Sequence, residues 1–487
     1  MKQYECDLCV IAAGPAGLAA AVSAAEKEAR VVVLEKAPTT GGASNMAMGP
    51  LGVETKIQRE SLIGITREEA FRKFMDYTHW RVDPRLVREY IYKSASTIEW
   101  LQAMGVEFFG AFKYFPESEA TWHIVKPESG EMGPRASGAM IRIMTERAKE
   151  LGVQFLFETP AKKILKEGGR VVGVLATDKS GEEVRVDCSA AVIATGGFGD
   201  NPEMIKEMTG FEYGKNMFNF RVPGVVGDGL KMAWEAGADK TACNIEMAYS
   251  CPAGDECPTV KALHQQPNLM VNLQGERFVN EDVMSNTTYF SNALATQKKS
   301  VGWSVVDDSI VNHYRKNGPD KFNLVFHIHT FEPYRDEFEK AAKSYPKFFV
   351  TADSIEELAE KMGVDKAGLA KTVAEYNEAC KSRDTLFAKD SRYMKPLKGP
   401  KYYAIAFYPG GYGSLGGIRI NYKTEVLDTE WNPIPGLYSA GTDANTIFGD
   451  SYVFILPGNT MGFALNSGRM AGENSVDYLV ELYSANQ

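Results

Sequence analysis

Two segments near the N-terminus decide the fold: DLCVIAAGPAGLAAA at residues 7–21 and VVVLEKAPTTGGASNM at residues 31–46. Leu8–Ile11 is apolar throughout, as expected for a buried parallel strand. Ala16–Glu28 follows as a helix with alanine and leucine facing inward, and Val31–Leu34 forms a second strand. The segments therefore predict a strand–turn–helix–strand unit.

The turn of this unit matches a dinucleotide-binding fingerprint. Gly14 lets the backbone approach a pyrophosphate, Gly17 lets helix and strand pack closely, and the helix N-terminus offers free N–H groups to the anion. Glu35 ends the second strand 18 residues after Gly17, where it can accept the hydroxyls of an adenosine ribose. The alternative, a glycine-rich turn that binds nothing, leaves Glu35 without a role.

One position departs from the fingerprint. Ala12 replaces the first glycine of G-x-G-x-x-G. Alanine fits there when the turn keeps a negative φ, so we expect a negative φ at Ala12.

A second pair of glycines selects the dinucleotide. Gly41 and Gly42 follow the acidic strand directly and lead into Ala43 and Ser44. A nicotinamide site does not need this pair, whereas FAD does, because backbone must run flat under its pyrophosphate and ring. We therefore expect FAD rather than NAD.

Composition sets the broader class. A length of 487 residues exceeds what one core usually serves, so two domains are expected. A net charge of −9 argues against nucleic acid as a partner, and we expect no membrane insertion and no leader before the first strand. Seven scattered cysteines are typical of a reducing compartment, so we expect a cytoplasmic protein.

Later segments of the chain also predict contacts with the dinucleotide. Residues 161–174 and 181–186 predict part of a β-meander, and AAVIATGGFGD at residues 190–200 predicts another buried strand that ends in a glycine pair. Gly227–Gly229 opens a further helix, and a helix from Gly462 onward would point its N-terminus at the electron-rich edge of a flavin.

The fold class is therefore α/β: a Rossmann-like FAD-binding domain with a β-meander, interrupted by an α+β capping domain. Composition places the FAD-binding domain at residues 1–248 and 408–487, and the capping or substrate domain at residues 249–407. The residues expected to bind the cofactor lie in the glycine turns, at the acidic strand end and at the helix starts: Ala13, Gly14, Ala16, Gly17, Glu35, Lys36, Gly41, Gly42, Ala43, Ser44, Thr195, Gly196, Gly197, Asp228, Gly441, Thr442, Asn459, Thr460 and Met461.

Nearly the whole chain resembles a known superfamily. The resemblance rests on the fingerprint with TTGGAS, on ATGGF, on GDGLKMAWEAGA, on GERFVNE at residues 275–281, on GLYSAG and on PGNTMGFA. These motifs resemble the fumarate reductase/succinate dehydrogenase flavoproteins, a group that includes urocanate-type reductases and 3-oxosteroid dehydrogenases. The resemblance implies a mobile capping domain, an active site between the domains, and hydride transfer between flavin N5 and an activated C=C. It also implies non-covalent FAD, because the glycine-pair loop lacks the histidine to which some members of the group link FAD covalently.

The same resemblance assigns a proton donor. Arg277 in GERFVNE matches the arginine that delivers a proton in the fumarate reductases. An arginine can act only as a relay, because its pKa is far above neutrality, and Glu281 is the expected relay partner. The alternative is that Arg277 and Glu281 form a structural ion pair.

The substrate ligands of fumarate reductases are absent. Where those proteins have two histidines and a carboxylate-binding arginine, this chain has the segments 249–252, 412–417 and 455–457, none of which contains a histidine or an arginine. A dicarboxylate needs charge-assisted partners to offset its desolvation. The sequence therefore argues against fumarate and favours a neutral or weakly polar enone or enoate.

The last motif is closer to that of the 3-oxosteroid dehydrogenases, in which a tyrosine hydroxyl and a glycine N–H hold the ketone oxygen. Gly458 matches that glycine, while Phe454 stands where the tyrosine is expected. A catalytic hydroxyl could come from Tyr412 or Tyr452, and Tyr408, Phe454 and Gly458 are the expected substrate contacts.

Three functions stay open at this point. The favoured one is an FAD-dependent oxidoreductase of an enone or enoate, more a reductase than a dehydrogenase, with an external electron donor or acceptor. A 3-oxosteroid or bile-acid dehydrogenase or reductase is the alternative, and an electron carrier or non-catalytic subunit is the alternative from another class. We expect no metal: Cys251 with Cys257, and His327 with His329, lack further ligands.

Overall fold

The computed structural model describes residues 1–218, 220–254, 256–322, 325, 331 and 334–485. The chain divides into two compact units. The first contains Met1–Gly210, Arg221–Glu246 and Gly413–Gln487, and the second contains Phe211–Phe220 and Met247–Tyr412.

A six-stranded sheet forms the centre of the first unit, in the order β16-β17-β10-β2-β3-β6. The strands from β17 to β6 pair in parallel, and β16 is antiparallel to β17. The strands of this sheet are β2 Leu8–Ile11, β3 Val31–Leu34, β6 Gln154–Leu156, β10 Ala190–Ile193, β16 Glu425–Leu427 and β17 Pro433–Ser439. This is the predicted Rossmann-like arrangement, in which the apolar strands β2, β3 and β10 are fully buried.

A smaller sheet contains the predicted meander. Its order is β1-β9-β8-β7, with β7, β8 and β9 antiparallel and the N-terminal β1 added in parallel to β9. These strands are β1 Lys2–Glu5, β7 Ala161–Glu167, β8 Arg170–Thr177 and β9 Glu183–Asp187. The predicted α/β class with a β-meander is thus confirmed.

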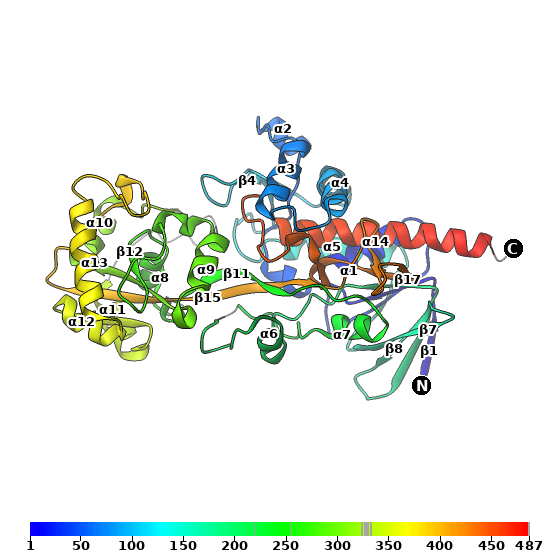
Figure 1. Ribbon diagram of the computed structural model, residues 1–487. Helices are drawn as coiled ribbons and strands as arrows, with labels where there is room; N and C mark the ends of the chain where they lie inside the picture. Colours follow the sequence, from blue (N-terminus) through cyan, green and yellow to red (C-terminus); the bar gives the residue numbers. More distant parts are fainter. Residues whose placement is uncertain (219, 255, 323–324, 326–330, 332–333, 486–487) are drawn as a thin grey trace. The chain divides into compact units, whose positions relative to one another are not determined.

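Helices complete the first unit. The longest, α14 at Asn459–Ser484, lies along α1 at Pro15–Ala25 (Figure 1). A β-carbon on Gly468 or Gly472 of α14 would overlap the carbonyl oxygens of Ala16 or Ala20, so these glycines set the close approach of the two helices. The other helices of the unit are α2 Lys56–Glu60, α3 Arg67–Tyr77, α4 Pro84–Ala103, α5 Gly138–Glu150, α6 Pro202–Thr209 and α7 Asp228–Glu235, and a short hairpin joins β4 Phe108–Phe112 to β5 Trp122–Val125.

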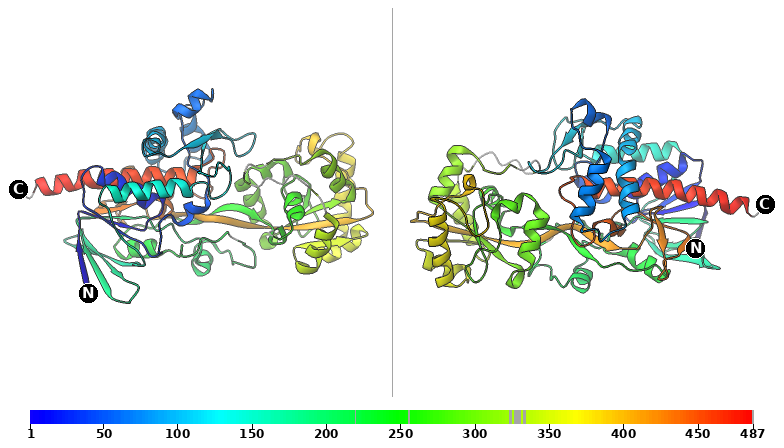
Figure 2. Two further views of the ribbon diagram at one scale, coloured as in Figure 1. Left: turned by 180° about the vertical axis from the view of Figure 1, so that it is seen from behind. Right: turned by 45° about the horizontal axis from the view of Figure 1, so that its top comes forward.

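The second unit is built on an antiparallel sheet. Strand β13, Gly302–Asp307, pairs with β12, Leu269–Val271, and with β15, Tyr402–Gly417. Strands β11 Asn244–Ser250 and β14 Phe349–Ala352 also adjoin β15. The helices that pack around this sheet (Figure 2) are α8 Pro258–His264, α9 Thr287–Ala295, α10 Asp308–Asn317, α11 Tyr334–Ser344, α12 Ile355–Met362 and α13 Lys366–Ala379.

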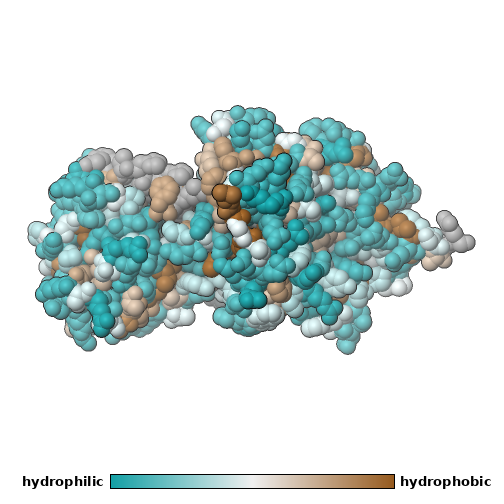
Figure 3. All heavy atoms as spheres, turned by 90° about the horizontal axis from the view of Figure 1, so that it is seen from above, coloured by the Kyte–Doolittle hydropathy of each residue, from teal (hydrophilic) through white to brown (hydrophobic). Residues whose placement is uncertain are grey.

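Hydrophilic side chains cover most of the face drawn in Figure 3, as expected from a charged content of 24%. Within the described residues, no helix combines the length and the apolar character that a membrane span requires.

The backbone at Ala12 corrects one expectation. Ala12 has φ of +86°, not the negative φ that the alanine suggested. The turn is held from both sides, because the N–H of Ala12 donates to Leu34 O at 2.7 Å and Gly17 packs against the Ala12 carbonyl. The left-handed conformation is therefore imposed by neighbours in spite of the β-carbon, at a cost of about 1–2 kcal/mol.

This conformation gives a stability prediction. Ala12→Gly should raise the free energy of unfolding of the cofactor-free protein by roughly 0.5–1 kcal/mol, because relief of the left-handed alanine exceeds the entropy cost of glycine. Urea denaturation followed by circular dichroism measures the change. The matched control is the buried neighbour Ala13, where Ala13→Gly should lower stability. A loss of stability in Ala12→Gly would contradict the assignment of strain.

Candidate functional site

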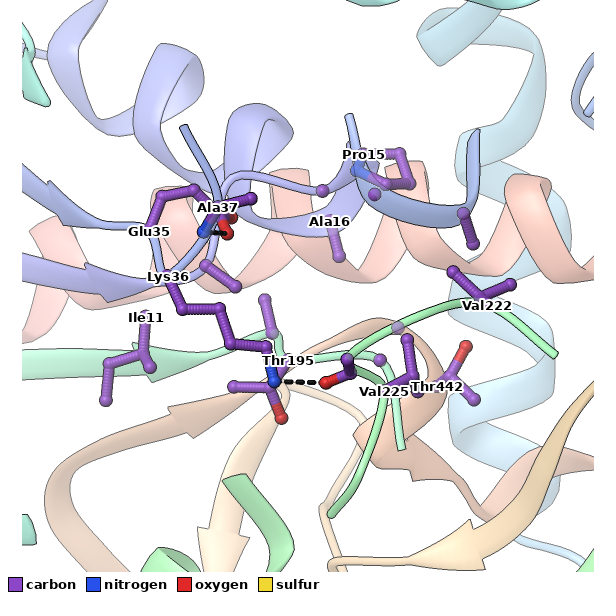
Figure 4. Close-up of a pocket in the computed structure, with 18 of the residues that line it drawn as sticks. Ile11, Pro15, Ala16, Glu35, Lys36, Ala37, Thr195, Val222, Val225 and Thr442 are labelled. Carbon is purple, nitrogen blue, oxygen red and sulfur yellow. Dashed lines mark hydrogen bonds between the residues drawn. The ribbon is translucent and has the colours of Figure 1, made fainter. Parts of the chain in front are cut away.

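A cavity in the first unit lies at the carboxyl ends of β2, β3 and β10, where open parallel sheets commonly bind ligands (Figure 4). Its walls come from the turns after these strands, the loop 222–225, and the starts of α1, α7 and α14. Its lining residues are Ile11, Ala12, Gly14, Pro15, Ala16, Leu34, Glu35, Lys36, Ala37, Gly42, Ala43, Ser44, Ala47, Pro160, Ala161, Ala194, Thr195, Gly196, Val222, Pro223, Gly224, Val225, Asp228, Met232, Gly441, Thr442, Thr460, Met461 and Ala464.

Three helix N-termini meet this cavity. The N-cap residues of α1, α7 and α14 are Gly14, Gly227 and Gly458, which have no side chain to cap the helix. Two of the first-turn N–H groups are bound elsewhere, since Gly229 donates to the Thr195 hydroxyl and Thr460 to the Tyr452 hydroxyl. The first N–H groups of a helix have no partner within the helix, and together with the helix dipole they favour an anion. The donors of the cavity therefore suit the pyrophosphate and the electron-rich ring edge of a flavin dinucleotide.

The glycines of the fingerprint are of two kinds, because Gly14 borders the cavity whereas Gly17 is packed against backbone. A β-carbon on Gly14 would meet no atom within 4 Å, so the backbone at Gly14 borders open space. A β-carbon on Gly42 would lie 4.0 Å from the α-carbon of Gly14, which places the two glycines across from one another. At Gly17, by contrast, a β-carbon would overlap the carbonyl oxygen of Ala12, so that glycine serves packing.

Glu35 is fixed at the end of β3. Its Oε2 accepts the N–H of Ala13 at 2.7 Å. Its Oε1 accepts the N–H of Ala37, also at 2.7 Å (Figure 4). Each carboxylate oxygen can accept more than one hydrogen bond. The buried carboxylate therefore keeps acceptor capacity toward the cavity while its orientation is set by the backbone.

The next residue, Lys36, holds the loop 222–225 and the start of α7 in place. Its Nζ donates to Asp228 Oδ2 at 2.7 Å and to the carbonyl oxygen of Gly224. The loop 222–225 was not predicted from the sequence to line the site. The sequence feature that could have indicated this loop is the Val-Pro-Gly turn just before Gly227–Gly229.

Asp443 is a second residue that the sequence analysis missed. The buried carboxylate accepts the backbone N–H groups of Thr195, Gly196 and Gly197, and the hydroxyl of Thr195. Burial raises the pKa of Asp443, while these donors favour its charged form. Asp443 thus fixes the glycine turn after β10, and its signal was the acid in the segment Gly441–Asp443.

Most of the predicted cofactor residues border the cavity. Those that do so are Gly14, Ala16, Glu35, Lys36, Gly42, Ala43, Ser44, Thr195, Gly196, Asp228, Gly441, Thr442, Thr460 and Met461. Five lie behind its wall: Ala13, Gly17, Gly41, Gly197 and Asn459. These five hold the wall in place; the Asn459 amide, for example, donates to Val453 O and Leu456 O in the turn before α14.

Arg277 and Glu281 lie in the second unit and form a bidentate ion pair, with Nε–Oε1 and Nη2–Oε2 distances of 2.9 and 2.7 Å. Asp384 binds the same guanidinium through Nη1 and Nη2 at 3.0 and 2.9 Å. Burial opposes the charge of Arg277, but the two carboxylates outweigh burial and raise its pKa above the usual value. Arg277 is therefore held as a cation with both carboxylates behind it.

Asp384 and Lys389 were not found from the sequence, because they are far along the chain from Arg277. Burial works to raise the pKa of Asp384, yet hydrogen bonds from Arg277 and from backbone N–H groups lower it to about 2. Lys389 Nζ lies 3.4 Å from Glu281 Oε2, and burial lowers its pKa. The cluster thus contains two cations and two carboxylates.

The predicted substrate residues fall in different units. In the first unit, Tyr452 is buried and its hydroxyl oxygen accepts the Thr460 N–H at 3.0 Å. Phe454 lies 5.7 Å from Tyr452, ring centroid to centroid, and Gly458 is the N-cap of α14.

The other two tyrosines belong to the second unit. The Tyr408 ring lies 4.9 Å from that of Phe218, and Tyr412 is 43% exposed with its ring 6.2 Å from that of Phe220. Among the described residues, no group of three histidine, cysteine or acidic side chains could hold a metal ion; His327 and His329 lie outside the described residues.

Comparison with known proteins decides the family. A family model described as "FAD binding domain" matches residues 7–459. The chain belongs to this family. A vinyl phenol reductase of Lactiplantibacillus plantarum is 33% identical over 98% of this chain and 97% of its own. A fumarate reductase (cytochrome) of Shewanella frigidimarina is 28% identical over 97% of this chain and 77% of its own.

Among solved structures, a 3-ketosteroid delta1-dehydrogenase from Sterolibacterium denitrificans has a TM-score of 0.77 at 20% identity, over 97% of this chain and 99% of that one. This likeness concerns the fold. Together the comparisons confirm the superfamily, the FAD cofactor and the class of FAD-dependent oxidoreductase acting on carbon–carbon double bonds. The cavity lined by most of the residues expected to bind FAD is our candidate FAD pocket.

The geometry at Gly14 predicts a separable effect on FAD. Gly14→Ala should leave the stability of the FAD-free protein within about 0.5 kcal/mol, since φ of −71° suits alanine and the added carbon meets no protein atom. It should weaken FAD binding at least about tenfold, because the methyl group enters the space for the pyrophosphate. Fluorescence titration of the apoprotein measures affinity, and the exposed Gly64→Ala is the control. Unchanged FAD affinity in Gly14→Ala would overturn the placement of the pyrophosphate.

Proposed function

We propose that this chain is a reductase that transfers hydride to an activated C=C of a neutral or weakly polar alkene, and that it does not act on fumarate. Bound FAD supplies the hydride chemistry. The proposal rests on the absence of positively charged side chains at the three segments where the resemblance expects the substrate ligands of a fumarate reductase. Those segments contribute the buried Cys251, Leu415 and Leu456, none of which carries a positive charge.

Uncharged side chains at these positions favour an uncharged substrate. A dicarboxylate loses its hydration on entering a protein and requires cationic partners to recover that energy. A neutral alkene conjugated to a carbonyl or an aromatic ring has no such requirement and suits apolar and tyrosine side chains. The 33% identity to a vinyl phenol reductase supports the same substrate class.

Protonation favours the reductive direction. Burial raises the pKa of Tyr452 above the ordinary phenol value, so its hydroxyl keeps its proton at neutral pH. Arg277 likewise stays protonated. Both groups are therefore in the protonated form that a proton donor requires, whereas a dehydrogenase requires a deprotonated base.

In this proposal Arg277 delivers the proton and is resupplied through Glu281, whose carboxylate binds two of its N–H groups. Tyr412 and Tyr452 remain the proposed sources of a catalytic hydroxyl, and Tyr408, Phe454 and Gly458 the proposed substrate contacts. The proposal retains residues 249–407 as a capping domain and an external electron donor. The seven free cysteines and an isoelectric point near 5.5 support a cytoplasmic location.

A substrate panel tests the proposed class. FAD in the holoenzyme is reduced anaerobically and then mixed with a vinyl phenol, an enone, a 3-oxosteroid or fumarate. Reoxidation of the flavin, followed by absorbance, should be at least about a hundredfold faster than in buffer with a neutral alkene and unaccelerated by fumarate. Selective reoxidation by the 3-oxosteroid would favour the steroid alternative, and no acceleration by any compound would favour an electron carrier. Fast reoxidation by fumarate would contradict the proposal.

Arg277→Lys tests the proton relay while it keeps a positive charge between Glu281 and Asp384. Reoxidation by the best alkene should slow about 10²–10⁴-fold, because the bidentate geometry of the guanidinium is lost. Reduction of the flavin by dithionite and FAD content should stay as in the wild type. The exposed Arg392, paired with Asp390, provides the control Arg392→Lys. Full activity in a folded Arg277→Lys variant would show that Arg277 has only a structural role.

A further inference from the structure

Glu246 is a buried carboxyl group to which the proposed function assigns no task. It lies in β11 at the end of the segment Arg221–Glu246 of the first unit, and 5% of the residue is exposed. Its Oε1 accepts the hydroxyl hydrogen of Thr460 at 2.9 Å. Its Oε2 is buried and has no hydrogen-bond partner among the described residues. An unpaired oxygen of this kind calls for an explanation, because burial without a partner is costly.

The unpaired oxygen lies next to the FAD pocket. A β-carbon placed on Gly413 would be 3.6 Å from Glu246 Oε2 and 3.5 Å from the Thr442 methyl group. Thr442 and Thr460 both line the pocket, and Figure 4 labels Thr442 at its edge. Glu246 Oε2 is therefore behind the part of the wall formed by the segment Gly441–Asp443 and the start of α14.

The charges that face Glu246 leave its ionised form uncompensated. Among the described residues, no lysine, arginine or histidine shifts the pKa of Glu246, on which only burial and the Thr460 hydroxyl act. Tyr452 is the titratable group that faces it, and its hydroxyl is bound to the Thr460 N–H on α14. Asp443, beside Thr442, is turned toward the Thr195–Gly197 turn. Burial raises the pKa of the Glu246 carboxyl to about 7, with the Thr460 hydroxyl opposing the rise.

A second negative charge appears at this place when FAD is reduced, if the flavin ring occupies the Thr442–Thr460 end of the pocket. The N-terminus of α14 can stabilise one anion there. An ionised Glu246 beside a reduced anionic ring would place two like charges in a buried environment, which disfavours ionisation of both.

We propose that Glu246 takes up one proton at Oε2 when FAD is reduced and releases it when FAD is reoxidised. Reduction of bound FAD to its anionic form would take two electrons from the external donor and one proton from solvent. A second proton passes from solvent to the Glu246 carboxylate, giving neutral glutamic acid. Hydride transfer to the alkene restores oxidised FAD, and Glu246 returns its proton to solvent. This role rests on the FAD pocket and on its ring end, not on the identity of the alkene.

The test is the pH dependence of the two-electron midpoint potential of the FAD-loaded protein, between about pH 7.5 and 9.5. This window lies above the pKa of about 7, so Glu246 is ionised in the oxidised protein and can gain a proton on reduction. Each proton taken up changes the equilibrium tenfold per pH unit, which is about 30 mV for two electrons. The wild type should take up two protons, with a slope of about 60 mV per pH unit. Glu246→Gln should take up one, with a slope of about 30 mV per pH unit.

Glu235→Gln is the matched control, because Glu235 is exposed on α7 of the same unit and lies outside the pocket lining. It should keep the wild-type slope. Equal slopes in the wild type and Glu246→Gln would overturn the proposal.

A second measurement covers the case in which Glu246→Gln does not fold or bind FAD. Infrared difference spectra between the reduced and oxidised wild type at about pH 9 distinguish a protonated carboxyl group from a carboxylate. They should show one additional protonated-carboxyl band in the reduced protein. Absence of this band would also overturn the proposal. Neither measurement uses an alkene, so failure of the proposed substrate class leaves this test intact.

Discussion

The close approach of three backbone segments is the constraint on which the FAD site depends. Gly17 brings α1 against the carbonyl oxygen of Ala12 at the end of β2, and Gly468 and Gly472 bring α14 against α1. A side chain at any of these positions would push the helices apart by the width of at least a methyl group. The N-termini of α1 and α14 then could not border the same cavity, and the N-terminal ends of their helix dipoles could not act on one ligand.

Much of this arrangement follows from short-range sequence. The strands Leu8–Ile11 and Val31–Leu34 have the predicted limits, because a run of buried apolar residues ended by glycine or an acid leaves few alternatives. Helix ends are less well defined: α1 ends at Ala25, short of the expected Glu28, and α14 begins at Asn459, before the expected Gly462. The glycine N-cap Gly458 explains the earlier start, since glycine with φ of +89° allows the chain to turn directly into the helix.

Long-range contacts are what the sequence could not supply. Asp443 is 248 residues from Thr195, and Asp384 is 107 residues from Arg277, so no local spacing pairs them. The φ of Ala12 was predicted with the wrong sign for a related reason. Local preference favours negative φ for alanine, but β3 and α1 together fix this turn and override the preference of the residue.

Two of the buried acidic sites, the cluster around Arg277 and the carboxyl group of Glu246, differ in how their charge is balanced. Around Arg277, two cations and two carboxylates neutralise one another, and each carboxylate has several donors, so a change of protonation would leave partners unpaired. Glu246 accepts one hydrogen bond from a hydroxyl group and has no cationic partner among the described residues. Protonation of Glu246 therefore disrupts few interactions. A buried ion cluster suits an arginine that is protonated at rest and that regains its proton through a carboxylate partner. A carboxyl group with an unpaired oxygen suits a site whose charge changes in each catalytic cycle, because its proton can follow the charge on the cofactor.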